Sequence, residues 1–183
     1  MAASYQLAPS YSLYKHVGGE DGMQASNDDG FISTTKEKTV APQFLPGGTG
    51  YVYKISAIET FIDVEGSFGS LYHLFNDEAE VSAMYKIPWS LVIGWTRYEN
   101  GQAKETGTNP SYQRNTANRE DGGDQPQFAG FPFNHQAWDM RPWSKLERAS
   151  SRHQDGSGAP SVQALAEFAA EYFEDIGMNP QNL

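Results

Sequence analysis

The strongest structural signal in this sequence is a series of short runs of β-branched and aromatic residues, separated by glycine and proline. The clearest run is residues 51–56, in which Tyr51, Tyr53 and Ile55 alternate with other residues and would share one face of a strand. Three further runs are also predicted to be extended: residues 31–35, 61–64 and 87–98. The sequence therefore predicts several short strands in its first hundred residues.

Helical signals are fewer. Residues 13–17 before Gly18 suggest one helical turn, and residues 36–44 a short helix. One long amphipathic helix is predicted from Ser161, a plausible N-cap, to Gly177. Its apolar residues recur at helical spacing: Val162, Leu165, Phe168, Ala169, Tyr172, Phe173 and Ile176.

The remaining segments organise the chain. Residues 100–127 are polar and are predicted to form a long surface loop. The aromatic residues between 128 and 143 are expected to pack at one edge of the core. We predict a domain over residues 1–147, a flexible linker over 148–160, and a C-terminal helix and tail over 161–183.

Composition limits the classes of partner. The chain has 13 basic and 23 acidic residues, a formal net charge of −10. We therefore expect no nucleic-acid partner, and a cationic or mixed-charge protein partner fits better. No run reaches the length of a membrane span. Because the chain has no cysteine, disulfides, thiol catalysis and zinc–thiolate sites are excluded, and no metal site is expected.

Two carboxylates stand close together in the sequence. Glu78 and Glu80 precede the apolar run that starts at Ile87. In an extended backbone both side chains would leave the same side of the strand, about 6 to 7 Å apart. Like charges at that distance raise each other's pKa and suit a cationic substrate or a positive charge in a transition state. A solvated acidic turn is the alternative.

A hydroxyl-rich strand precedes the acidic pair. In residues 31–35, Ser33 and Thr35 would share one face with Phe31, and Thr34 would take the other. Buried hydroxyls need partners, and a carboxylate across a cleft would be a strong one. An edge strand with these hydroxyls in water is the alternative.

Four blocks of sequence together resemble one protein family. They are residues 28–35 (Asp-Asp-Gly-Phe-Ile-Ser-Thr-Thr), 51–53 (Tyr-Val-Tyr), 77–95 with its Glu-Ala-Glu, and 129–143 with His135 and Trp138. Their order and spacing resemble the catalytic A1 chain of the cholera toxin and heat-labile enterotoxin family, over residues 12–146. The resemblance implies an α+β mono-ADP-ribosyltransferase fold, with two small mixed sheets around a cleft for NAD.

The resemblance also implies roles for individual residues. Glu80 matches the glutamate that contacts the nicotinamide ribose, and Glu78 the upstream glutamate associated with an arginine acceptor. Ser33, Thr34 and Thr35 match the strand that lines the nicotinamide side of the cleft and orients the catalytic glutamate. His16 resembles a helix histidine that borders the active site. NAD would be the substrate that these residues bind.

From this resemblance we expect a secreted toxin or effector that acts in a host cell and modifies an arginine of a host protein. The alternative is an inactive relative of the same fold that binds a host protein. The two differ in whether the chain binds NAD and transfers ADP-ribose.

One family feature has no match. Family members begin with a strand that bears an NAD-gripping arginine. Lys15 stands only 18 residues before Ser33, and lysine cannot reproduce a planar, bidentate guanidinium grip. We therefore expect the family fold without this strand. The strand could come from a separate N-terminal fragment, could have been truncated, or could be lost in a non-catalytic relative. We also expect the sheet edge it would leave to be covered.

Overall fold

The computed structural model describes residues 9–18, 29–69, 78–114, 121–132, 135–145 and 162–179. These residues fall into two compact units, which are described separately. Residues 32–124 form the first, called the strand unit. Residues 9–31 and 125–179 form the second, called the helix unit. The predicted linker, residues 148–160, lies outside the described residues.

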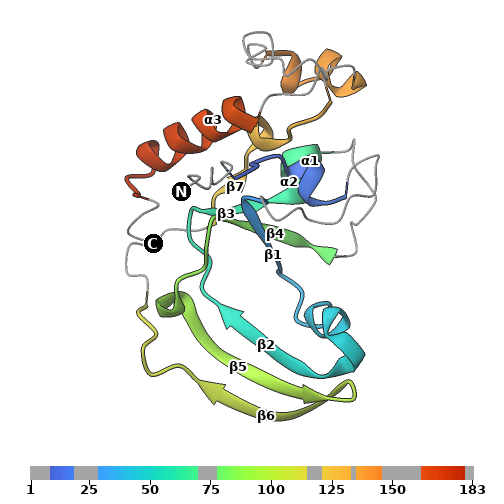
Figure 1. Cartoon of the computed structure of the whole chain (residues 1–183), viewed down its shortest axis with the longest axis vertical. Coiled ribbons are helices and arrows are strands. Elements are labelled where there is room, and N and C mark those ends of the chain that lie inside the picture. The colour runs from blue at the N-terminus through green and yellow to red at the C-terminus, as the bar shows by residue number, and fades with distance from the viewer. Residues whose placement is uncertain are drawn as a thin grey trace, which may run out of the picture. The chain divides into compact units, whose positions relative to one another are not determined.

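The first sheet is mixed and has four strands (Figure 1), and Glu80 is the first residue of one of them. Its strand order is β1-β4-β3-β7, and the bounds are β1 Phe31–Thr35, β3 Phe61–Asp63, β4 Glu80–Met84 and β7 Gly123–Asp124. Strand β3 pairs antiparallel with β4 and parallel with β7. The predicted strand at residues 31–35 is confirmed.

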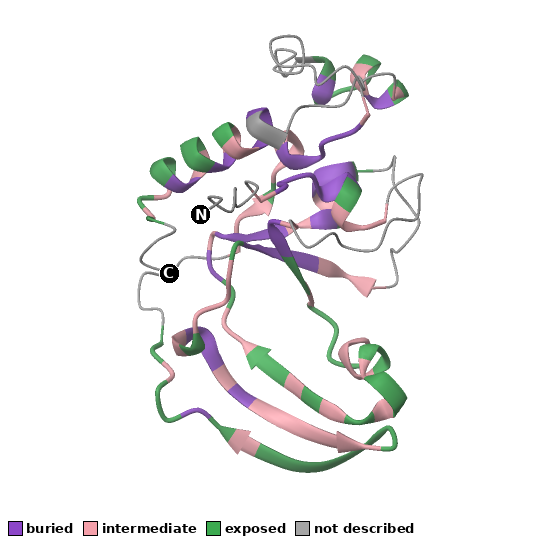
Figure 2. Ribbon diagram, viewed as in Figure 1, coloured by how far each residue is buried: buried purple, intermediate pink, exposed green. Residues whose placement is uncertain are grey.

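The core of the strand unit lies in β3, β4 and helix α2 (Val64–Phe68), as Figure 2 shows. Phe61, Ile62, Ala83 and Met84 are at most 2% exposed. Burying an apolar side chain of this size stabilises a fold by about 1.5 to 3 kcal/mol. The carboxyl-terminal part of β4 is therefore anchored in the core, while its first residue, Glu80, is partly exposed.

The second sheet is antiparallel throughout, in the order β2-β5-β6. Its strands are β2 Gly50–Ile55, β5 Val92–Glu99 and β6 Gln102–Thr108. Because β6 lies within residues 100–127, the predicted surface loop is wrong there. Asn100 and Gly101, with φ of 52° and 75°, form the two-residue turn that joins β5 to β6. Because both faces of β6 are almost wholly exposed, its sequence does not alternate between apolar and polar residues. The strand pairs with β5 through backbone hydrogen bonds.

Two other boundaries differ from the prediction. The strand predicted for residues 87–98 begins only at Val92, because Trp89–Leu91 forms a 3₁₀ turn after Pro88. The helix predicted for residues 36–44 is only a 3₁₀ turn, Ala41–Phe44, followed by another at Pro46–Gly48. Pro42 supplies no N–H and limits helix growth at this point.

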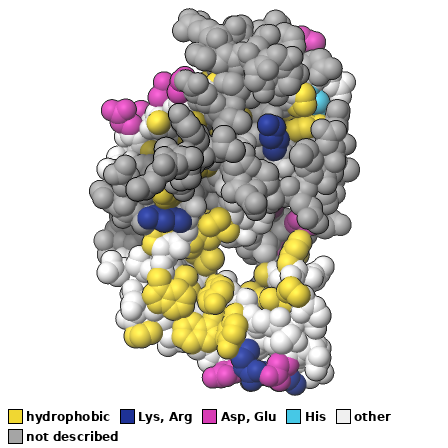
Figure 3. Space-filling view, viewed as in Figure 1, with side chains coloured by type: hydrophobic (Ala, Val, Ile, Leu, Met, Phe, Trp, Pro, Cys, Tyr) yellow, Lys and Arg dark blue, Asp and Glu magenta, His cyan; other side chains and the backbone are white. Residues whose placement is uncertain are grey.

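An aromatic row lies across β2 and β5, and Figure 3 shows hydrophobic side chains gathered over this part of the strand unit. Tyr51 stacks on Tyr53, Tyr53 meets Trp89 edge to face, and Trp89 stacks on Trp95. The ring of Trp95 lies over Gly107 of β6, where a Cβ would come within 2.3 Å of it. Aromatic contacts of this kind add to sheet stability beyond the buried area.

The helix unit holds α1 (Leu13–His16) and α3 (Val162–Asp175). Both were predicted, and the described part of α3 ends before Gly177, which has a φ of 68°. The amide of Met178 donates to the carbonyl of Phe173, as expected of a helix capped by a left-handed glycine. None of the described helices is long and apolar enough to cross a membrane.

The predicted aromatic cluster packs inside the helix unit. Phe131 is fully buried and lies against His135, Trp138 and Trp143. Three 3₁₀ turns carry this segment: Pro126–Phe128, Gln136–Asp139 and Trp143–Lys145. The interpretation of the aromatics as packing residues is confirmed for Phe128, Phe131 and Trp143, which are buried, while Phe133 lies outside the described residues.

We expect Gly130→Ala to destabilise the helix unit strongly. Gly130 has a φ of 62°, and a Cβ there would lie 2.4 Å from Ser12 Oγ, whose hydroxyl donates to the Gly130 carbonyl. The combined strain and overpacking should cost about 2 to 4 kcal/mol of unfolding free energy. Gly177→Ala is the control, because Gly177 has a similar φ and nothing within 4 Å of a Cβ. Equal losses in urea denaturation would contradict the close packing of Gly130 on Ser12.

Candidate functional site

The acidic pair lies on a turn at the start of β4. Ala79 has a φ of 44°, and the strand begins at Glu80. The extended backbone that would put both carboxylates on the same side of a strand is therefore not found at residues 78–80, because the left-handed Ala79 breaks the alternation of side chains. The pKa of Glu78 is nevertheless raised, first by partial burial and second by the charge of Glu80. The two carboxylates are therefore close enough to interact.

Strand β1 holds this turn by hydrogen bonds. Thr35 Oγ1 donates to the backbone carbonyl of Glu78 at 2.5 Å, and the amide of Lys36 donates to the carbonyl of Ala79 at 3.1 Å. Thr34 Oγ1 donates to the carbonyl of Val81. The hydroxyls of Thr34 and Thr35 thus fasten β1 to β4 through the backbone.

These contacts bear on the predicted NAD-binding residues. A hydroxyl has one hydrogen to donate, and Thr34 and Thr35 each donate theirs within the protein. Either could still accept a hydrogen bond from a ligand, although Thr35 Oγ1 already accepts one from the amide of Glu37. Ser33 is exposed on the same strand. The NAD-binding roles of the three residues stay predictions.

A serine that the sequence reasoning missed contacts Glu80. Ser82 Oγ donates to Glu80 Oε1 at 3.1 Å, and Ser82 is completely buried. Residues two apart in a strand share one face, so the Glu-x-Ser spacing was a usable signal. A buried hydroxyl can hold a carboxylate in one orientation.

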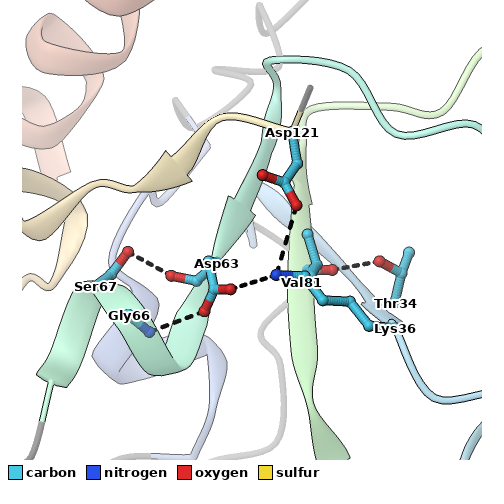
Figure 4. A network of polar contacts seen from close by, with 7 residues as sticks. All are labelled: Thr34, Lys36, Asp63, Gly66, Ser67, Val81 and Asp121. Carbon is cyan, nitrogen blue, oxygen red and sulfur yellow. Dashed lines mark hydrogen bonds and ion pairs between the residues drawn. The ribbon is translucent and has the colours of Figure 1, made fainter. Parts of the chain in front are cut away.

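A lysine joins the end of β1 to the neighbouring segments (Figure 4). Lys36 Nζ lies 2.5 Å from Asp63 Oδ2 and 3.5 Å from Asp121 Oδ2. The hydrogen bond to Asp63 is the main cause that raises the pKa of Lys36. Asp63 also caps α2, because its Oδ1 accepts from the amide of Gly66 at 2.8 Å. Nothing in the sequence indicated this contact.

His16 belongs to the helix unit, whereas Ser33, Thr35, Glu78 and Glu80 belong to the strand unit. His16 ends α1, and its Nδ1 lies 2.6 Å from Asp29 Oδ2, with side chains 3% and 11% exposed. Its ring also packs on Phe31. The structure thus shows a buried His–Asp pair, and the role of His16 beside a substrate stays a prediction.

Two expectations about other groups can be compared with the described residues. We predicted that another segment covers the sheet edge left by the missing strand. Ser10 forms a parallel bridge with Asp29, just before β1. Residues 1–8 lie outside the described part. Within the described part, no group of three or more His, Asp or Glu residues could hold a metal ion.

Sequence comparison shows which proteins this chain is similar to. The sequence model of the heat-labile enterotoxin alpha chain matches residues 6–174. The NAD(+)–arginine ADP-ribosyltransferase Chelt of Vibrio cholerae is 34% identical over 148 residues, which are 73% of this chain and 24% of that protein. The heat-labile enterotoxin A chain of Escherichia coli is 34% identical over 144 residues, which are 72% of this chain and 54% of that protein. The chain thus spans about half the length of one relative and about a quarter of the other.

Solved structures give the same result for the fold. A heat-labile enterotoxin double mutant superposes with a TM-score of 0.68 and 26% identity, over 94% of this chain and 81% of that chain. An E. coli heat-labile enterotoxin mutant superposes with a TM-score of 0.61 and 27% identity, over 79% of this chain and 81% of that chain. The predicted α+β fold class with two small sheets is confirmed.

Proposed function

The chain belongs to the heat-labile enterotoxin alpha-chain family, and from this membership we propose that it transfers ADP-ribose from NAD to an arginine of a host protein. The observation that carries the proposal is the Glu78–Glu80 turn, where the charge of Glu80 helps to raise the pKa of Glu78. Two crowded carboxylates suit a reaction that involves two cationic partners.

Glu80 would stabilise the first cation. When the bond between nicotinamide and ribose breaks, nicotinamide leaves with the bonding electrons and positive charge develops on the sugar, as in glycoside cleavage. A carboxylate already fixed in place stabilises that charge without reorganising. The hydrogen bond from the buried Ser82 to Glu80 Oε1 supports this role, because it limits the movement of the carboxylate.

Glu78 would act on the second cation, the acceptor guanidinium. As a guanidinium nitrogen bonds to the ribose carbon, it must lose a proton, and Glu78 would accept it as a general base. Partial burial and Glu80 raise the pKa of Glu78 above its ordinary value. A carboxylate with a raised pKa is a stronger base than an ordinary glutamate.

Following the family resemblance, we propose NAD-binding roles for Ser33, Thr34 and Thr35 of the strand unit and, separately, for His16 of the helix unit. The Ser33 side chain is exposed on β1, and the Thr35 hydroxyl can add acceptor capacity. The protein would be secreted and act in a host cell, as its toxin relatives suggest.

The test is transfer of labelled ADP-ribose from NAD to a small guanidino acceptor and to water. We expect transfer to the guanidine and slower NAD hydrolysis, with and without an added peptide that carries an arginine-bearing strand. Calorimetry with NAD alone separates binding from chemistry. If the protein neither binds NAD nor transfers ADP-ribose under any of these conditions, the inactive, host-protein-binding alternative replaces the enzyme.

A further inference from the structure

The ammonium group of Lys36, the residue after β1, contacts two carboxylates on other segments, those of Asp63 and Asp121. Lys36 comes directly after β1, and Asp63 ends β3. Strand β4 lies between β1 and β3 in the sheet. The Lys36 side chain therefore reaches past the strand that begins with Glu80, as Figure 4 shows.

The backbone of the same residue holds the acidic turn. The amide of Lys36 donates to the carbonyl of Ala79, the residue between the two glutamates. Its side chain is fixed to Asp63 and Asp121, and its amide is fixed to Ala79. We propose that Lys36 is a positioning residue for the Glu78–Glu80 turn: the ammonium group, held by Asp63 and Asp121, keeps its own amide in place against Ala79.

The turn needs such support for two physical reasons. Ala79 has a φ of 44°, a backbone conformation that residues other than glycine adopt only with strain. The charges of Glu78 and Glu80 also repel each other, as the raised pKa of Glu78 indicates. A strained, self-repelling turn relaxes unless other groups hold it. Two of the hydrogen bonds that hold it come from Thr35, the last residue of β1, and from Lys36, which follows β1.

The contact is suited to positioning more than to overall stability. The Lys36 side chain is 48% exposed, against 23% for Asp63 and 30% for Asp121. Ion pairs at this exposure contribute little to unfolding free energy. Removing the ammonium should therefore leave the protein folded and loosen residue 36 locally, which allows the proposal to be tested in an intact protein.

The first test measures hydrogen exchange at the Lys36 amide by NMR. In Lys36→Met, which keeps an unbranched side chain one atom shorter and removes the charge, we expect the protection of this amide to fall by about tenfold through local opening. Lys36→Arg should keep the protection because it keeps the cation. Lys38→Met is the matched control: Lys38 is an exposed lysine two residues away. Unchanged protection in Lys36→Met would overturn the proposal.

The second test is kinetic and rests on the proposed function. We expect kcat for ADP-ribose transfer to fall by about tenfold in Lys36→Met through misplacement of the carboxylates, with KM for NAD changed less than twofold. Lys36→Arg should restore kcat, and Asp121→Asn should lie between. If kcat is unchanged in an active protein, Lys36 does not position the turn. If the wild type itself transfers nothing, the proposed function fails, and the exchange measurement alone decides the role of Lys36.

Discussion

Replacing Glu80 with glutamine is expected to lower the rate of both ADP-ribose transfer and NAD hydrolysis by about 10² to 10³-fold, the effect of removing a fixed charge from a transition state. Both reactions break the same bond between nicotinamide and ribose, so both lose the same stabilisation. Glutamine keeps the size of the side chain and can still contact Ser82. The thermal unfolding midpoint should therefore change little.

The measurement is the release of labelled nicotinamide, with and without a guanidino acceptor. Glu65→Gln is the matched control, because Glu65 is an exposed glutamate in the first turn of α2. It should keep full activity. Glu80→Gln with more than a third of the wild-type rate would show that the carboxylate does not stabilise the reacting sugar.

Replacing Glu78 with glutamine is expected to separate the two reactions. Transfer to a guanidino acceptor should fall by about 10² to 10⁴-fold, the usual contribution of a general base. NAD hydrolysis should stay within a few-fold of the wild type, because water does not need the base that deprotonates a guanidinium. Equal losses in both reactions would contradict the acceptor-side role of Glu78 and place it with Glu80 on the nicotinamide side.

The same variant should change stability with pH in a defined direction. The pKa of Glu78 is higher in the folded chain than its ordinary value of 4.5, so the folded state binds the proton more tightly than the unfolded state. Ionising Glu78 therefore costs stability, and this cost appears as pH rises above the ordinary value. Glu78→Gln should unfold at a higher temperature than the wild type near neutral pH and at the same temperature near pH 3. An equal difference at both pH values would mean that the charge is not the cause.

The prediction of the fold succeeded where local signals and tertiary structure agree. The strand of residues 31–35, the helix before Gly177 and the aromatic packing around Phe131 each have a local pattern that the structure keeps. The prediction failed at β6, where pairing with β5 through the backbone makes a strand from polar residues. The Asn100–Gly101 turn was the available signal.

Local patterns also predicted the part of the candidate site that lies within one short segment, and missed the contacts between segments. Glu78 and Glu80 are two residues apart, so they lie near each other in any backbone conformation. The sequence could not show that Ala79 is left-handed, or that the hydroxyls of Thr34 and Thr35 bind backbone carbonyls of the β4 segment instead of side chains. These contacts join residues more than 40 positions apart.

Three features could be read from the order of amino acids alone: the family, the order of the strand-forming runs, and two neighbouring carboxylates that follow a hydroxyl-rich strand. The contacts around those carboxylates became visible only in the fold: the hydrogen bond from the buried Ser82 to Glu80, the hydrogen bonds from Thr35 and Lys36 to the turn, and the ion pairs of Lys36 with Asp63 and Asp121. Hydrogen bonds and ion pairs form only when the two groups lie within a few ångströms of each other. Such distances between segments far apart in the chain exist only after the sheet has formed.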